Sequence, residues 1–297
     1  MRYKLLLSLI VTILIFVFIF IRIDMGSFTG YLLTINPIIF VIAMLFTALT
    51  VTLNGIRWKY LISKHCEIGV WKSIKLTLLG LSFNIVTPSR LGDFTKAHYL
   101  KKDRLMDFKS GSSSIVFEKG LDTLCLSVLS IIGIIAMGLS NFYVLILIPV
   151  IILVVIFKIG YLKRVGFIMR RKTLGGIVLS FCDFFEGVRR DRKMFLITLG
   201  MTFLLWGLSL MQVYLFFLCF GLSPNMLSIF GLVPLAILVG MIPITIIGMG
   251  TRDSAMIFLF PNIPSPIVLG VAFFMTLRYI LSAIAGLPTT REYLQKF

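Results

Sequence analysis

The sequence predicts an all-α polytopic membrane protein, with about six full transmembrane helices and two re-entrant helical hairpins that enter from opposite sides. Three observations predict this class. Of the 297 residues, 59% are hydrophobic and only 14% are charged, and the mean hydropathy is +1.04. Lys and Arg number 29 against 12 Asp and Glu. In membrane proteins such an excess collects in cytoplasmic loops and faces anionic head groups, so it requires no nucleic-acid partner.

Six apolar segments are long enough to cross a bilayer. They are Leu5–Ile21, Ile35–Leu53, Ser112–Gly138, Asn141–Phe157, Met194–Phe220 and Ser265–Leu287. The distribution of Lys and Arg predicts a plasma-membrane protein with both chain termini in the cytoplasm. Leu174–Val188 mixes acidic and apolar residues and is predicted to lie at the membrane interface. We treat residues 1–297 as one integral membrane domain.

Two further apolar segments are predicted to enter the membrane and return. Leu76–Val86 has basic residues on both sides, and its length of about 16 Å is half of the hydrocarbon core. Pro88 is the natural break after it. Met226–Phe260 is interrupted by Pro234 and Pro243. A cytoplasmic C-terminus then requires either a re-entrant pair from outside or three crossings, and the re-entrant pair is simpler.

The two break points resemble each other and suggest an inverted repeat. Each joins a proline, a glycine, an arginine and an aspartate. The first contains Pro88, Arg90, Gly92 and Asp93, and the second contains Pro243, Gly250, Arg252 and Asp253. Coincidence in an apolar chain rich in Gly and Pro is the alternative. Glycine allows the backbone to leave helical pairing at membrane depth, and arginine can bind a phosphate bidentately.

Five charged residues within apolar segments are candidates for the site. Glu118 and Asp122 are spaced i,i+4 on one helical face, although acidic residues in the first turn of a helix would serve its dipole equally well. Arg252 and Asp253 form either part of a site or a salt bridge at a turn. Arg278 lies 13 residues into the last span, about 20 Å along the helix, where an anionic ligand or a protein partner is required.

Other chemistries lack their residue patterns. The four cysteines are scattered and the two histidines lie in basic segments, so no metal site and no Ser/His/Asp arrangement is expected. The sequence contains no GxxxxGK[ST] motif, which argues against ATP hydrolysis. We therefore expect no cofactor and no catalytic residue.

Three motifs resemble the flippase-like transmembrane region of lysylphosphatidylglycerol synthases. They lie in Asn84–Asp93, Glu118–Asp122 and Pro243–Asp253. The resemblance implies lipid translocation or presentation, and it extends to relatives that handle polyprenyl-linked sugars. We expect the soluble aminoacyl-transferase domain of the two-domain members to be absent. Many relatives carry arginine, glycine and glutamate where this chain has Lys119, Ile247 and Asp253, which leaves the substrate open.

The sequence thus predicts a non-enzymatic protein that moves an anionic phospholipid or a polyprenyl-phosphate-linked lipid between leaflets. Arginines would bind the phosphate, and acidic residues would position the arginines. The alternatives are a lipid-modifying transferase with Glu118 or Asp122 as base, and a membrane anchor for a soluble glycosyl- or aminoacyl-transferase. The predicted substrate-binding residues are Asn84, Pro88, Arg90, Asp93, Glu118, Asp122, Gly250, Arg252, Asp253 and Arg278.

Overall fold

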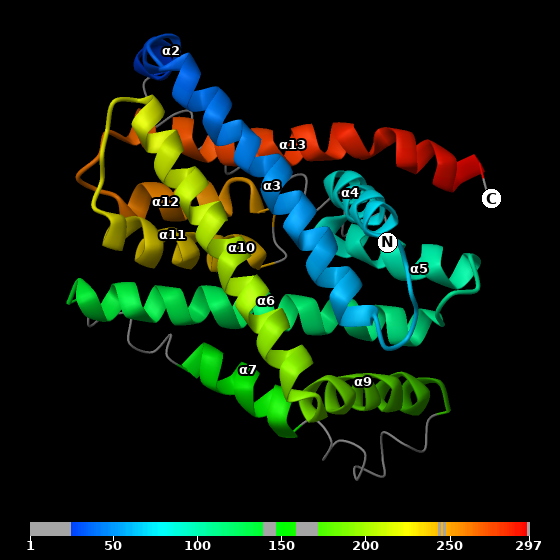
Figure 1. The fold of residues 1–297 in the computed structure, drawn as a ribbon. Coiled ribbons are helices and arrows are strands. Elements are labelled where there is room, and N and C mark those ends of the chain that lie inside the picture. Colours follow the sequence, from blue (N-terminus) through cyan, green and yellow to red (C-terminus); the bar gives the residue numbers. More distant parts are fainter. Residues whose placement is uncertain (1–24, 139–146, 159–171, 243–244, 246–247, 296–297) are drawn as a thin grey trace.

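The computed structural model describes residues 25–138, 147–158, 172–242, 245 and 248–295, and the regular secondary structure of these ranges is all helical (Figure 1). The predicted all-α class is confirmed there. The helices, with η1 the 3₁₀-helix, are α2 (Met25–Leu33), α3 (Pro37–Ile62), α4 (Val70–Val86), η1 (Pro88–Phe94), α5 (Thr95–Lys102), α6 (Phe108–Ala136), α7 (Leu147–Lys158), α9 (Lys172–Arg190), α10 (Arg192–Cys219), α11 (Met226–Met241), α12 (Thr251–Leu259) and α13 (Ser265–Gln295).

Four of the described helices, α3, α6, α10 and α13, are long and apolar enough to cross a membrane. They correspond to four of the six predicted spans. The predicted span Leu5–Ile21 lies outside the described residues, and only the second half of Asn141–Phe157 is described, as α7. Side-chain caps begin several of these helices: Asn36 accepts hydrogen bonds from two backbone N–H groups of α3, and Asp107 does the same for α6.

Two helices extend beyond the predicted apolar segments into the basic stretches next to them. α3 continues nine residues beyond Leu53 to Ile62, and Arg57 is buried within it. α4 begins at Val70 instead of Leu76, so it has 17 residues and a length of about 25 Å. The predicted boundaries were wrong because a basic residue does not end a helix when other residues can pair with it.

Each half of the chain contains a helical hairpin with a glycine at its closest approach. A Cβ on Gly92 of η1 would lie 2.7 Å from the carbonyl oxygen of Gly80 in α4, and a Cβ on Gly248 would lie 2.4 Å from that of Gly240 in α11. Gly248 also has a positive φ of 76°, which favours glycine. Pro234 lies inside α11 and does not interrupt it, contrary to the prediction.

The helices form two halves with the same order and opposite direction. Corresponding helices begin 155 to 157 residues apart: α3 and α10 at Pro37 and Arg192, α4 and α11 at Val70 and Met226, α5 and α12 at Thr95 and Thr251, α6 and α13 at Phe108 and Ser265. In Figure 1, α3 and α10 cross the molecule side by side in opposite directions, and α6 and α13 are also antiparallel. The α4–α5 and α11–α12 hairpins lie on opposite sides of the α3–α10 pair.

The hairpin of each half packs on the long helix of the other half. α4 lies against α13, and α11 lies against α6. Both crossings depend on glycine: a Cβ on Gly286 would lie 2.4 Å from the carbonyl oxygen of Leu78, and a Cβ on Gly133 would lie 2.1 Å from the Cα of Gly231. Small residues at such crossings let two backbones approach closely, as is common in membrane helix bundles.

A local contact repeats with the same spacing. The hydroxyl of Thr95 donates to the carbonyl oxygen of Gly92 at 2.6 Å, and that of Thr251 donates to the carbonyl oxygen of Gly248 at 3.3 Å. Both pairs are related by 156 residues. This register makes Arg252 the counterpart of Lys96, and it therefore corrects the match of Arg90 with Arg252 that the sequence suggested.

α9 includes the segment that was predicted to lie at the membrane interface, and it is amphipathic. Cys182, Phe184, Phe185 and Val188 are buried, whereas Leu179 is exposed, and the helix packs on α6 and α10. The apolar core is divided between the two hairpins. One cluster fills the space around α10, α11 and α13, and a second lies at the basic end of α3, around α4, α5 and α9.

Candidate functional site

Arg57 is the centre of a buried network of ion pairs. Its guanidinium donates to Asp122 Oδ1 at 2.6 Å and to Glu118 Oε1 at 2.8 Å. It also donates to the hydroxyl of Thr202 at 3.0 Å and to Asn54 Oδ1 at 3.2 Å. Arg57 and Glu118 are each only 1% exposed. Because these side chains come from α3, α6 and α10, the network connects three of the four long apolar helices.

Glu118 binds a second buried cation. Lys96 Nζ lies 3.1 Å from Glu118 Oε2 and 4.8 Å from the centre of the Trp58 ring. The indole N–H of Trp58 donates to the hydroxyl of Ser114 at 3.2 Å. Lys96 belongs to α5, so this contact fixes the returning arm of the first hairpin to α6.

Asp93 joins η1 to the same network. Its Oδ2 lies 2.8 Å from Lys119 Nζ, which is also 3.9 Å from Asp122 Oδ2. Asn84 Nδ2 donates to Asp93 Oδ1 at 3.1 Å, and the indole N–H of Trp206 donates to Asp122 Oδ1 at 3.1 Å. The three carboxylates of the network thus each contact at least one of its three cations, and buried charges are stable only when they are paired in this way.

Arg278 of α13 lies across from this network. Its NH1 donates to the hydroxyl of Ser209 at 2.9 Å and to Gln212 Oε1 at 2.8 Å. Gln212 in turn donates to the hydroxyl of Thr47 at 2.8 Å and to the carbonyl oxygen of Ala43 at 2.9 Å. Arg278 is 6% exposed, so its guanidinium lies inside the protein, next to side chains of α10.

The two polar groups are related by the inverted repeat. Arg57 donates to Thr202 of the other half, and Gln212 donates to Thr47 of the first half. Corresponding residues of α3 and α10, each pair 155 residues apart, are Thr47 and Thr202, Asn54 and Ser209, and Arg57 and Gln212. The site therefore lies where the two halves meet, and the corresponding helices α6 and α13 carry opposite charges, Asp122 and Arg278.

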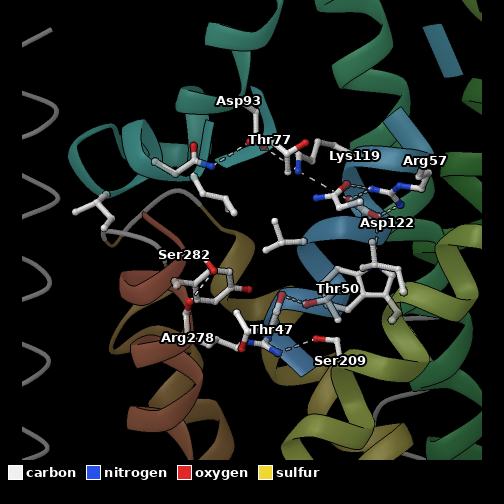
Figure 2. A pocket seen from close by; sticks show the side chains of 18 residues that line it. Thr47, Thr50, Arg57, Thr77, Asp93, Lys119, Asp122, Ser209, Arg278 and Ser282 are labelled. Atoms are coloured by element: carbon white, nitrogen blue, oxygen red, sulfur yellow. Dashed lines mark hydrogen bonds and ion pairs between the residues drawn. The ribbon is translucent and has the colours of Figure 1, made fainter. Parts of the chain in front are cut away.

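A cavity of about 110 Å³ separates the Arg57 network from Arg278 (Figure 2). Figure 2 shows Arg57, Lys119 and Asp122 on one side of it and Arg278 on the other. Side chains of α3, α4, η1, α6, α10 and α13 form the walls, and among the described residues α11 and α12 contribute none. The cavity thus belongs to the side of the first hairpin.

The structure brings five of the predicted site residues together. Asn84, Asp93, Asp122 and Arg278 line the cavity, and Glu118 lies directly behind Arg57. Glu118 and Asp122 are ten and fourteen residues beyond the start of α6. Their alternative interpretation as first-turn residues that serve the helix dipole is therefore wrong.

Gly250, Arg252 and Asp253 form a separate cluster at the start of α12. Arg252 donates to Asp253 Oδ1 at 2.6 Å, to the carbonyl oxygen of Ala272 at 2.9 Å and to the hydroxyl of Thr276 at 2.8 Å. Asp253 Oδ2 accepts from the backbone N–H of Gly250 at 3.0 Å. This cluster fixes α12 to α13 as Lys96 fixes α5 to α6. Three further residues of the predicted break points lie outside the described part of the structure. These are the side chains of Pro88 and Arg90, and the whole of Pro243.

Sequence reasoning missed three cations of the site: Arg57, Lys96 and Lys119. The excess of Lys and Arg was attributed as a whole to cytoplasmic loops that face anionic head groups, so Arg57 and Lys96 were not singled out as site residues. The available signal was the continuation of the apolar helix past Leu53 without a proline, together with two membrane carboxylates that require partners. Among the described residues, no group of three or more His, Cys, Asp or Glu side chains is arranged to hold a metal ion.

The fold and the site define a class: a helical integral membrane protein in which two inverted halves enclose a charged cavity. The chain belongs to the family described as the lysylphosphatidylglycerol synthase TM region, whose pattern matches residues 5–286. The resemblance seen in the motifs is therefore confirmed, and it connects the protein with lipid-related function in the membrane.

Two archaeal relatives match over most of their length. A UPF0104 membrane protein of Methanothermobacter thermautotrophicus is 25% identical over 289 residues, which cover 86% of this chain and 85% of the relative. The UPF0104 membrane protein MJ1595 of Methanocaldococcus jannaschii is 25% identical over 312 residues, which cover 95% and 93%.

Proposed function

We propose that the protein moves lipids with anionic head groups, either phospholipids or polyprenyl-phosphate-linked lipids, between the two leaflets of the cytoplasmic membrane. The observation that carries this proposal is the charged cavity between two inverted halves. Intramembrane charges that line a cavity mark the path of a polar substrate, and inverted repeats are the architecture of proteins that alternate access to such a site.

The position of the cavity supports entry from the cytoplasmic side. Its residues on α3 run from Thr47 to Arg57; Arg57 is about 8 Å and Thr47 about 22 Å from the end of the helix at Ile62. That end carries Lys59 and Lys64, and basic residues mark the cytoplasmic side. In this assignment both chain termini are cytoplasmic, and the α4–α5 and α11–α12 hairpins are re-entrant from opposite sides.

The opposite side is closed by apolar packing. Side chains of α10, α11, α12 and α13, including Val213, Phe217, Phe260 and Met275, form one buried cluster beyond Arg278. A head group in the cavity thus reaches the middle of the protein from the cytoplasm and meets this cluster. Translocation requires the second hairpin to separate from α10 and α13 while the first closes.

Reconstitution in liposomes tests the proposal. Fluorescent phosphatidylglycerol or a fluorescent polyprenyl phosphate is included in the bilayer, and a membrane-impermeant quencher measures the fraction in the outer leaflet over time. Wild-type protein is expected to expose the inner-leaflet lipid to the quencher. Two variants are expected to abolish this exposure: Asp122→Asn, which leaves Arg57 with one carboxylate fewer, and Ser282→Phe, which fills the cavity without removing a charge. Glu292→Gln, on an exposed part of α13, serves as the control.

Each result has a defined meaning. Wild-type liposomes that behave like protein-free liposomes contradict translocation. A new lipid product formed from a supplied donor, and lost in Asp122→Asn, would support the transferase alternative instead. Thermal unfolding of each variant in detergent separates loss of activity from loss of fold.

A further inference from the structure

The charges of the cavity do not cancel. Three cations line it, Arg57, Lys119 and Arg278, against two anions, Asp93 and Asp122. Behind the wall, Lys96 and Glu118 add one charge of each sign and pair with each other. Among the described side chains, the cavity wall and the pair behind it therefore carry one excess positive charge in a region of low dielectric, where the sign and number of ligand charges strongly affect binding.

The carboxylates of the cavity are already bound by the protein. Asp122 accepts from Arg57 and Trp206, and Asp93 contacts Lys119 and Asn84. An ammonium group on a lipid would have to displace one of these partners and would enter a cavity that is already positive. The geometry therefore disfavours head groups that carry an amine, including aminoacylated ones.

The other polar groups of the wall are neutral. Eight hydroxyl and amide side chains line the cavity, from α3, α4, α10 and α13. Apart from Asp93 Oδ2, which Lys119 Nζ contacts at 2.8 Å, two buried atoms of the wall residues have no hydrogen-bond partner, the acceptor Asn84 Oδ1 and the donor Arg57 Nε. Asn84 and Arg57 are 6% and 1% exposed, and buried polar atoms are costly unless they are paired. A hydroxyl both donates and accepts, so it can satisfy either atom.

We propose that the head group recognised here is a singly charged phosphodiester that carries a small neutral polyol. This inference rests on the proposed function and specifies its substrate class. One phosphodiester balances the one excess positive charge, whereas a diphosphate leaves negative charge uncompensated. A cavity of about 150 Å³ accommodates a benzene ring, so the volume of about 110 Å³ favours a small head group over an oligosaccharide. A phosphatidylglycerol and a polyprenyl phosphate monosaccharide share this chemistry.

Native mass spectrometry of the purified protein with defined lipids tests the inference. The probes are phosphatidylglycerol, phosphatidylethanolamine, lysyl-phosphatidylglycerol, polyprenyl phosphate glucose and polyprenyl diphosphate. We expect phosphatidylglycerol, polyprenyl phosphate glucose or both to bind about tenfold or more tightly than the amine-bearing and diphosphate lipids. The affinities of phosphatidylglycerol and polyprenyl phosphate glucose, compared with each other, show which of these two lipid classes carries the recognised head group. Equal binding of an amine-bearing lipid or of the diphosphate to the wild type would overturn the inference.

Two variants of one ion pair provide the sharper test. Asp93→Asn and Lys119→Gln both break the Asp93–Lys119 contact, but they change the cavity charge from +1 to +2 and to zero. We expect Asp93→Asn to bind the diphosphate about tenfold more tightly than the wild type, and Lys119→Gln to bind every anionic probe about tenfold more weakly. A change of the same sign in both variants would indicate a structural effect and would refute the inference. Glu292→Gln removes one negative charge at an exposed position. It is expected to leave the binding of the diphosphate and of the other anionic probes unchanged.

The Asn84 amide is tested separately. Asn84→Leu keeps the cavity charge and removes the acceptor, so it should reduce binding of phosphatidylglycerol to that of the phosphatidic acid methyl ester, which has no hydroxyls. Unchanged discrimination between these two lipids would remove the polyol from the inference. Binding is measured independently of transport, so the two proposals can fail separately. Selective binding without leaflet transfer would refute only the proposed function. Leaflet transfer without head-group selectivity would refute only this inference.

Discussion

Arg57 shows at the residue scale how a strongly apolar bundle keeps a charge. Burial of an unpaired guanidinium is prohibitively costly, and two carboxylates, a hydroxyl and an amide oxygen surround this one. Such a network is poor evidence for stability, because a buried ion pair roughly breaks even with apolar residues of the same size. In the proposed function, the anionic head group of the lipid is the ligand that uses these charges.

Replacement of Arg57 by Met is expected to lower the free energy of unfolding by about 3–5 kcal/mol, because it leaves Glu118 and Asp122 with fewer cations. The quadruple variant Arg57→Met, Lys96→Met, Glu118→Gln, Asp122→Asn removes two buried cations together with their two carboxylates and should recover most of this loss. Glu292→Gln breaks an exposed contact with Lys75, at 3.9 Å, and should cost less than about 1 kcal/mol. Unfolding in detergent measures all three variants. A quadruple variant no more stable than Arg57→Met would contradict this explanation.

The partners of these charges were only half predictable. Glu118, Asp122 and Arg278 stand in apolar segments, so the sequence identifies them as site residues. Arg57 was missed because the rule that assigns basic residues to the cytoplasm treats every arginine as a loop residue. Only the tertiary arrangement shows that an arginine four residues beyond an apparent span faces two acids on another helix.

At the scale of elements, the crossing of α6 and α11 depends on two glycines that face each other. A Cβ on Gly133 would lie 2.1 Å from the Cα of Gly231, so Gly133→Ala must push the helices apart. We expect it to cost about 1–3 kcal/mol, as overpacking does. Gly120→Ala in the same helix meets no atom within 4 Å and should be neutral or stabilising by up to about 1 kcal/mol. Equal losses in both variants, measured by unfolding in detergent, would exclude the contact as the cause.

The start of α6 provides a pH-dependent test. Partial burial raises the pKa of Asp107, but the hydrogen bonds that its carboxylate accepts at the helix terminus outweigh this and bring the pKa below its ordinary value of 3.8. The charged cap therefore stabilises the fold above the unfolded pKa, and this contribution is lost as the pH falls through the lower folded pKa. Asp107→Ala should cost about 1 kcal/mol at pH 7, and the difference should shrink below about pH 4. Asp107→Asn should retain most of the capping hydrogen bonds. If the difference in stability between the wild type and Asp107→Ala did not change with pH, the charged form of Asp107 would not be what stabilises the helix.

Helix boundaries were less predictable than helix existence. α6 and α10 lie within a few residues of their predicted limits, because long apolar runs define them. Pro234 was interpreted as a break, yet it lies inside α11, where its neighbours in the bundle can compensate for the missing N–H. The hairpin registers depend on backbone contacts of Gly92 and Gly248, which composition alone does not reveal.

On the scale of the whole molecule, the two halves share a fold but not a surface. The repeat relates Thr77 and Leu81 of the cavity wall, both in α4, to Val233 and Ile237 of α11, 156 residues later. Val233 and Ile237 are buried in the apolar cluster. The inverted repeat was suggested by sequence, but its register and this asymmetry required the packing. In the first half, α4 supplies part of the polar cavity wall, whereas its counterpart α11 lies in the closed apolar cluster.

If the halves exchange conformations, Ile237, which is buried here, must take the partly exposed, cavity-lining position that Leu81 has here, while Leu81 becomes buried. Single cysteines at these positions, in a background without Cys66, Cys125, Cys182 and Cys219, measure this through their reaction with a water-soluble thiol reagent. Leu81→Cys should react in the structure described here. Ile237→Cys should react more slowly but measurably, and conditions that slow one position should accelerate the other.

Ile229→Cys is the matched control, because Ile229 is buried in α11 like Ile237 and corresponds to Ser73, which does not line the cavity. It should stay unreactive in both conformations. Addition of phosphatidylglycerol to the cytoplasmic side should protect Leu81→Cys first, because the head group fills the cavity. If Ile237→Cys proved as inert as Ile229→Cys in liposomes that still transfer lipid, the two halves would not exchange, and the lipid would have to cross along the first half alone.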